Sequence, residues 1–177
     1  MKFRVIFFSL LVLGIVSCKK PEARRPKKQG TNDFYKEIIE KNKKLNALEK
    51  KYIENWILKD TLNKYEIASQ GFWYTYNKKD SVNAIKPAFE DQVLISYDIT
   101  DLNGTIIYEE EQKSYKIDKE DFIPALQEGI KLMKKGETIT FVIPSYSAFG
   151  VTGDGNKIAV NQPIKSTVTL IDIKSNK

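Results

Sequence analysis

Residues 122–150, FIPALQEGIKLMKKGETITFVIPSYSAFG, decide the fold of this 177-residue chain. The first part places apolar side chains at the spacing of one short helix, at positions 122, 123, 126, 130 and 133. Two lysines and then Gly136 are typical of a helix end. Residues 137–144 follow with an alternating pattern, which predicts a strand with one apolar face made of Ile139, Phe141 and Ile143.

The regions on either side of this stretch predict further strands. Asn103-Gly104, between two apolar segments, is the strongest short-range signal for a hairpin. Strand-like segments occupy residues 71–76, 92–100, 104–110, 114–117 and, after a long loop with three glycines, 164–174. Several antiparallel strands with one helix between them predict an α+β domain over residues 69–177, a curved antiparallel sheet wrapped around one short helix.

A helical arm is predicted upstream of this domain, over residues 33–68. Apolar residues from Phe34 to Tyr65 recur mostly at steps of three, four or seven, no glycine or proline interrupts residues 33–67, and Asp33 can cap the start. Two interpretations stay open. The segment is either one or two helices packed on the following domain, or an arm for dimerisation or partner binding.

The first residues have the pattern of an export signal. A basic start, MKFR, precedes a 12-residue apolar run, Val5–Val16, which is shorter than the roughly 20 residues that a membrane-spanning helix needs. Ile15-Val16-Ser17-Cys18 resembles the bacterial lipobox. We therefore expect residues 1–17 to be a lipoprotein signal peptide and Cys18 to carry lipid; the alternative is an ordinary secretory signal with an incidental cysteine.

Charge and composition exclude several classes of function. Of the net charge of +6, residues 1–18 carry +2 and residues 19–30 carry +5, so the remainder carries −1 and offers no basic footprint for nucleic acid. The basic residues belong to a tether, residues 18–32. A single cysteine rules out an intramolecular disulfide, and the lack of histidine rules out Ser-His and Cys-His hydrolases and nearly all zinc sites.

Five sequence words, in order, resemble the FKBP-type peptidyl-prolyl isomerases over about residues 69–174. These words are VLISYD (93–98), LNGT (102–105), FIPALQEG (122–129), KKGE with FVIP (134–144) and SAFG (147–150). The resemblance implies an FKBP fold and an enzyme that needs no cofactor and no metal. Isomerisation twists an amide against a barrier of about 18–20 kcal/mol without breaking a bond, so an apolar cradle and hydrogen bonds suffice.

The same resemblance implies which residues form that cradle. It places four side chains in the catalytic set, Tyr97, Phe122, Ile123 and Phe149, with the Ile123 backbone N–H donating to the ligand. It places three more in substrate binding, Ile107, Leu126 and Ile158. Core packing is the alternative role for each of them.

Some positions depart from the family pattern. Leu126 stands where the family usually has a tryptophan floor, and Phe149 lacks the hydroxyl of the usual loop tyrosine. Tyr108 replaces an acidic residue after the first hairpin, and Ser166 aligns with a phenylalanine of the last strand. Because polar groups are lost, we expect the site to bind the twisted amide with a smaller preference over the planar amide.

The signal, tether and arm together are similar to a narrower group, the FKBP-like lipoproteins associated with gliding motility in the Bacteroidetes. This resemblance implies a lipid anchor in the outer membrane, facing the periplasm, and proline-containing protein clients. The leading hypothesis is an isomerase that assists the folding of exported proteins. The alternatives are a non-catalytic chaperone and a structural module of a cell-envelope complex, and a homodimer through residues 33–67 is a further partner prediction.

Overall fold

The computed structural model describes residues 29–79 and 85–176. The chain divides into two compact units, Met1–Ile39 and Glu40–Lys177. The predicted signal peptide and Cys18 lie outside the described residues, as does the predicted tether up to residue 28.

Helix α2 spans Gln29–Lys59, so it begins before the segment that was predicted to be helical, residues 33–67, and also ends before that segment does. It begins inside the segment assigned to the tether. It ends early because the Asp60 carboxylate accepts hydrogen bonds from the Leu62 N–H at 3.2 Å, Asn63 Nδ2 at 2.9 Å and Tyr65 Oη at 2.9 Å. These local bonds stabilise a turn in place of another helical turn. No described helix is both long enough and apolar enough to cross a membrane.

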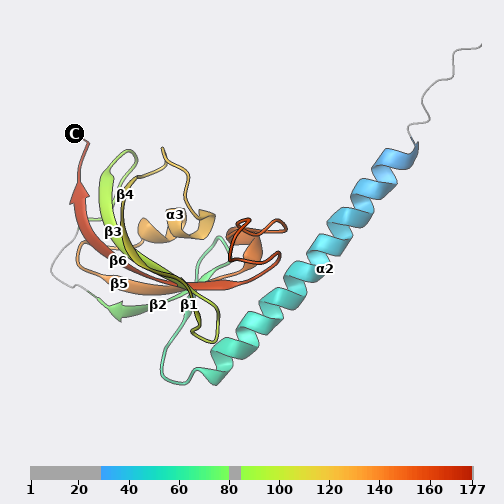
Figure 1. Ribbon diagram of the computed structural model, residues 1–177, viewed down its shortest axis with the longest axis horizontal. Helices are drawn as coiled ribbons and strands as arrows, with labels where there is room; N and C mark the ends of the chain where they lie inside the picture. Colours follow the sequence, from blue (N-terminus) through green and yellow to red (C-terminus); the bar gives the residue numbers. More distant parts are fainter. Residues whose placement is uncertain (1–28, 80–84, 177) are drawn as a thin grey trace, which may run out of the picture. The chain divides into compact units, whose positions relative to one another are not determined.

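Six strands form one sheet in the order β1-β2-β5-β6-β3-β4, and every neighbouring pair is antiparallel. The curved sheet wraps around helix α3 (Figure 1), which confirms the predicted α+β architecture. The strands are β1 (Glu66–Ile67), β2 (Trp73–Lys78), β3 (Gln92–Thr100), β4 (Ile106–Lys116), β5 (Thr138–Ile143) and β6 (Ile164–Lys174).

Two predicted elements differ from the structure. Strand β4 is continuous, although 104–110 and 114–117 were predicted as separate strands, because the intervening charged residues still pair with β3 at the sheet edge. Helix α3 is Pro124–Ile130, shorter than the apolar spacing over 122–133 predicts.

The predicted hairpin at Asn103-Gly104 connects β3 to β4. Gly104 has φ +92°, a left-handed conformation that glycine adopts without strain. The Asp101 carboxylate accepts a hydrogen bond from the Thr105 N–H at 2.8 Å and closes the turn. The pairing of β3 with β4 begins at this turn, and it aligns residues of the two strands that line the site described below.

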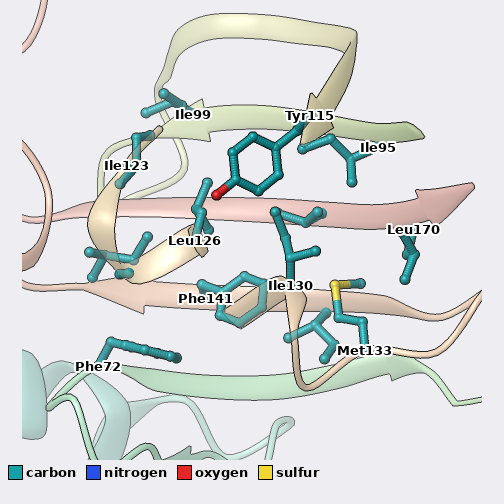
Figure 2. Packing of buried hydrophobic residues seen from close by; sticks show 14 of the residues in the cluster. Phe72, Ile95, Ile99, Tyr115, Ile123, Leu126, Ile130, Met133, Phe141 and Leu170 are labelled. Atoms are coloured by element: carbon teal, nitrogen blue, oxygen red, sulfur yellow. The ribbon is translucent and has the colours of Figure 1, made fainter. Parts of the chain in front are cut away.

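The main core fills the space between the concave face of the sheet and α3 (Figure 2). It includes fully buried side chains from both, among them Ile95, Leu126, Ile130, Met133, Phe141 and Leu170. Gly129 of α3 faces Phe141 so closely that an added Cβ would lie 2.5 Å from its Cε1. The short helix therefore contacts β5 through a residue without a side chain.

A second apolar cluster holds part of α2 within the second unit. Ile53 is fully buried there with Trp73, Leu102 and Val142. Three partly buried side chains complete the cluster, Trp56, Ile57 and Tyr65. Within residues 40–177, the prediction that the helix packs on the domain is therefore confirmed.

Candidate active site

A cavity of about 770 Å³ lies beside the N-terminal end of α3. We call its two walls the strand side and the loop side. The strand side consists of lining residues from β3, β4 and the start of α3, which are Tyr97, Ile99, Tyr108, Glu109, Glu110, Glu111, Lys113, Asp121, Phe122, Ile123 and Pro124. The loop side comes from the 144–163 loop and consists of Ala148, Phe149, Asp154 and Lys157.

Aromatic rings form the centre of the strand side. The ring of Phe122 lies edge-on to Tyr97, with 5.1 Å between centroids and an interplanar angle of 88°. On its other side Phe122 is 5.5 Å from Tyr115, which is fully buried. Ile123 is 7% exposed beside it. This central part of the strand side is thus apolar and closely packed, which suits it to binding a proline ring, while charged side chains such as Glu109, Lys113 and Asp121 line the rest of that side.

The hydroxyl of Tyr97 is held by a carboxylate from the neighbouring strand. Tyr97 Oη donates to Glu111 Oε1 at 2.5 Å, and the two residues are direct cross-strand partners. Burial, and then this hydrogen bond, raise the pKa of Tyr97 well above its usual 10.0. Tyr97 is therefore a neutral hydroxyl at physiological pH.

Tyr108 connects the strand side to the loop side. Its hydroxyl donates to the Asp154 carboxylate, and this hydrogen bond raises the pKa of Tyr108. Asp154 also accepts the N–H groups of Asn156 at 2.9 Å and Ile158 at 2.8 Å. Desolvation alone would raise the pKa of Asp154, but the combined hydrogen bonds lower it, so it is an anion at neutral pH.

Lys157 adds a second connection between the loop and strand β4. Its Nζ donates to the Ile107 carbonyl at 3.2 Å and lies 5.0 Å from the ring centroid of Tyr108. Gly153 permits the tight loop, because it has φ +67° and an added Cβ would lie 2.3 Å from the Ile158 carbonyl oxygen. The loop that carries Asp154 and Lys157 is therefore closely constrained against β4.

The four residues predicted as catalytic, Tyr97, Phe122, Ile123 and Phe149, come together in this cavity. The three predicted substrate contacts are not among its lining residues. Leu126 and Ile158 are 0% and 4% exposed in the main core, and Ile107 packs partly buried against that core. Their contact with substrate stays a prediction.

Two departures from the family pattern have a structural consequence here. Tyr108 stands in the position of the acidic residue, yet Glu111 supplies a carboxylate to Tyr97 from farther along β4. Ser166 is fully buried, and its hydroxyl donates to the Asp98 carbonyl at 2.6 Å. Each replacement therefore takes part in a hydrogen-bonded arrangement within the sheet or at its edge.

Tyr115 adds a polar atom that sequence reasoning did not consider. Among the described residues, its Oη is the one buried side-chain nitrogen or oxygen without a hydrogen-bond partner. In Figure 2 this hydroxyl points toward Leu126. Desolvation raises the pKa of Tyr115, so the hydroxyl is neutral. No signal in the sequence distinguishes it from a surface tyrosine of an edge strand.

Sequence reasoning also missed the charged residues at the rim, chiefly Glu111, Asp154 and Lys157. For Glu111 the available signal was its position on the strand opposite Tyr97, but only the register identifies it as the partner. Within the described part of the chain, no group of three or more metal-ligating side chains gathers to hold a metal ion.

Comparison with known proteins decides the family. Residues 83–171 match the sequence model of the family described as FKBP-type peptidyl-prolyl cis-trans isomerase. The chain belongs to this family. The expected enzyme class is confirmed at this level, since the chain carries a peptidyl-prolyl isomerase domain of the FKBP type.

An FKBP-type relative in sequence is a probable peptidyl-prolyl cis-trans isomerase, FkpA, from Neisseria meningitidis. The two are 30% identical over 90 residues, which is 50% of this chain and 33% of the relative. The chain thus matches about a third of the length of this curated relative. This partial match does not define the substrates of the present chain.

Solved structures share the FKBP-like fold. A peptidyl-prolyl cis-trans isomerase from Pseudomonas syringae has a TM-score of 0.60 at 19% identity, covering 73% of this chain and 96% of its own. FkpA from Escherichia coli also has a TM-score of 0.60, at 23% identity, covering 100% of this chain and 84% of its own. At these identities the likeness shows the fold of the FKBP domain.

Proposed function

We propose that this chain catalyses the cis–trans isomerisation of Xaa-Pro bonds in other proteins. The observation that carries this proposal is the aromatic wall of the cavity, where Phe122 packs edge-on to Tyr97 in a domain of the isomerase family. A proline ring against Phe122 and Ile123 would be shielded from water. The Ile123 N–H would orient a substrate carbonyl, while the Tyr97 hydroxyl, which donates its one hydrogen to Glu111, would fix the Tyr97 ring beside Phe122.

This surface can lower the barrier without covalent chemistry. The planar amide is stabilised by resonance that water supports through hydrogen bonds to its polar oxygen, and the twisted amide has lost that resonance. Binding the reacting bond against apolar side chains removes this support from the planar form. Each tenfold acceleration requires about 1.4 kcal/mol of preference for the twisted amide.

A protease-free isomerisation assay on a panel of Xaa-Pro peptides tests this function. We expect the chain to accelerate isomerisation and Phe122→Ala to lose most of kcat/KM, because the central ring of the wall is removed. Phe89→Ala is a matched control, since Phe89 is 61% exposed and does not line the cavity. No acceleration by a chain that circular dichroism shows to be folded would refute the proposal.

We further propose that the chain is exported, cut before Cys18 and anchored by lipid on that cysteine. The lipobox-like residues, the apolar run and the basic tether support this proposal. The resemblance to gliding-motility lipoproteins favours the outer membrane, facing the periplasm, with exported proteins as clients. We expect Cys18→Ala to move the protein from the membrane fraction to the soluble fraction; unchanged membrane association would contradict anchoring through Cys18.

A second candidate function is a non-catalytic chaperone or binding module, which includes a structural role in an envelope complex. Helix α2 favours it because large apolar side chains are more than half exposed there, namely Phe34, Tyr35, Ile39, Leu48, Tyr52 and Leu58. Suppression of aggregation that survives Phe122→Ala but is lost in Leu48→Glu would support this candidate. Sedimentation of the same two variants would show whether residues 33–67 instead form a homodimer.

A further inference from the structure

A carboxylate of helix α2 binds the beginning of the loop that carries Phe149. Glu49 Oε1 accepts the Ser145 backbone N–H at 2.6 Å, and Glu49 Oε2 accepts the Ser145 hydroxyl at 2.7 Å. Ser145 is 3% exposed and begins the short 3-10 helix Ser145–Ser147. The two residues are 96 positions apart in the sequence. Charge-assisted hydrogen bonds of this kind are stronger than neutral ones.

Ser145 in turn organises the residues around Phe149. Its carbonyl oxygen accepts the N–H of Ala148 at 2.9 Å and the N–H of Gly150 at 2.7 Å. These two amides flank Phe149, and both Ala148 and Phe149 line the cavity. Every backbone and side-chain polar group of Ser145 is therefore used, two toward Glu49 and one toward the cavity loop.

Both ends of this connection are firmly held. On the helix, Ile53 lies one turn beyond Glu49 and is fully buried with Trp73 and Val142. On the sheet, β5 ends at Ile143, and Pro144, also buried, leads directly to Ser145. A short path of packed and hydrogen-bonded groups thus runs from the arm to the rim of the cavity.

We infer that Glu49 is a positioning residue of the isomerase site, which acts by holding Phe149 in place; the inference rests on the proposed function. Without the carboxylate, a buried N–H and a buried hydroxyl would lose their partner, which is unfavourable. The 145–150 segment would then move to reach water and would carry Phe149 with it. The part of α2 that carries Glu49, within residues 40–59, is accordingly part of the catalytic unit.

Three variants of the full chain test this role. Glu49→Ala removes both acceptors, and we expect kcat/KM on an Xaa-Pro peptide to fall by about tenfold. Glu49→Gln keeps the geometry, because its carbonyl can accept the Ser145 N–H while its amide donates to the hydroxyl, so kcat/KM should stay within about twofold of the wild type. Glu54→Ala is the matched control, since that side chain is 47% exposed and forms a loose ion pair with Lys50 at 3.8 Å.

A further variant separates positioning from simple loss of stability. Ile53→Val removes one buried methyl group where the helix packs on the sheet and leaves Glu49 intact. We expect it to raise the unfolding equilibrium constant about fivefold, which corresponds to about 1 kcal/mol. At a temperature where all variants are folded, we expect Ile53→Val to retain kcat/KM. An equal loss in Ile53→Val and Glu49→Ala would overturn the inference.

Amide hydrogen exchange gives a readout that does not depend on activity. In Glu49→Ala we expect the amides of Ala148 and Gly150 to exchange about tenfold faster than in the wild type, with β3 amides unchanged. Unchanged exchange at these two amides would overturn the role of Glu49, as would faster exchange with unchanged kcat/KM. If the wild-type chain has no isomerase activity, the proposed function fails, and the exchange comparison alone then decides whether Glu49 holds the loop.

Discussion

The two sides of the cavity are built in different ways. On the strand side, Tyr97 and Tyr108 belong to the paired strands β3 and β4, whose backbone ladder shifts register between Tyr97 and Thr100, and Phe122 packs against the buried Tyr115. On the loop side, backbone hydrogen bonds hold the turn around Phe149 locally, and side chains connect the loop to other elements, through Glu49 to Ser145 and through Asp154 to Tyr108.

Because of this difference, we expect the free energy of unfolding to depend mainly on the strand side and the geometry of the cavity to depend mainly on the loop side. A ladder distributes its stabilisation over many equivalent hydrogen bonds, so a single change there acts on the whole fold. A loop held by two or three carboxylates can change its position while the sheet stays folded. Substitutions on the strand side should therefore change the free energy of unfolding most, and those on the loop side should change catalysis most.

The largest effect on stability is expected for Leu126→Ala behind the strand side. Leu126 is fully buried in the main core, and truncating it to alanine should lower the free energy of unfolding in urea by about 3 kcal/mol. Leu126→Met, which conserves volume, should cost less than about 1.5 kcal/mol. A large loss of kcat/KM in the stable Leu126→Met variant would show instead that Leu126 contacts substrate, as the sequence predicted.

Phe149→Ala on the loop side should reverse this order of effects. Phe149 is only partly buried, so the free energy of unfolding should fall by about 1 kcal/mol. We expect kcat/KM to fall about tenfold, equivalent to about 1.4 kcal/mol of lost transition-state binding. Val151→Ala in the same loop, at a residue that is 63% exposed, is the control. Unchanged kcat/KM in Phe149→Ala would place catalysis entirely on the strand side.

Tyr115→Phe should stabilise the strand side. The substitution removes a buried hydroxyl that has no hydrogen-bond partner among the described residues, so we expect the free energy of unfolding to rise by about 1 kcal/mol. Urea unfolding of Tyr115→Phe and the wild type measures the difference. A loss of stability would indicate that the hydroxyl has a partner in solution, such as a buried water molecule.

The smallest effect is expected from pH. No histidine is present and the raised pKa keeps Tyr97 protonated, so kcat/KM should be constant between about pH 6 and pH 9. Because the folded-state pKa of Tyr97 lies above the unfolded value of 10.0, its contribution to stability is complete below pH 10 and is lost as the pH rises through the folded-state pKa. Tyr97→Phe should remove part of that alkaline loss; a bell-shaped rate profile centred near pH 7 would contradict this account.

Local patterns in the sequence determined much of this protein. The bounds of β3 and β6, the hairpin at Asn103-Gly104 and the α+β architecture follow from alternation, turn chemistry and helical spacing, which act over a few residues. The family-like motifs also identified Tyr97, Phe122, Ile123 and Phe149, which line one cavity. This prediction was possible because each motif occupies a fixed position in the fold.

Only the tertiary structure decided the partners of these residues. Counting from the hairpin with a regular register would place Glu109 opposite Tyr97, but irregularities between Tyr97 and Thr100 shift the pairing to Glu111. Glu49 meets Ser145, and Asp154 meets Tyr108, across 96 and 46 positions of the chain. Such contacts depend on how strands shift and how a helix docks, which the energies of the whole packed domain determine and no local pattern encodes.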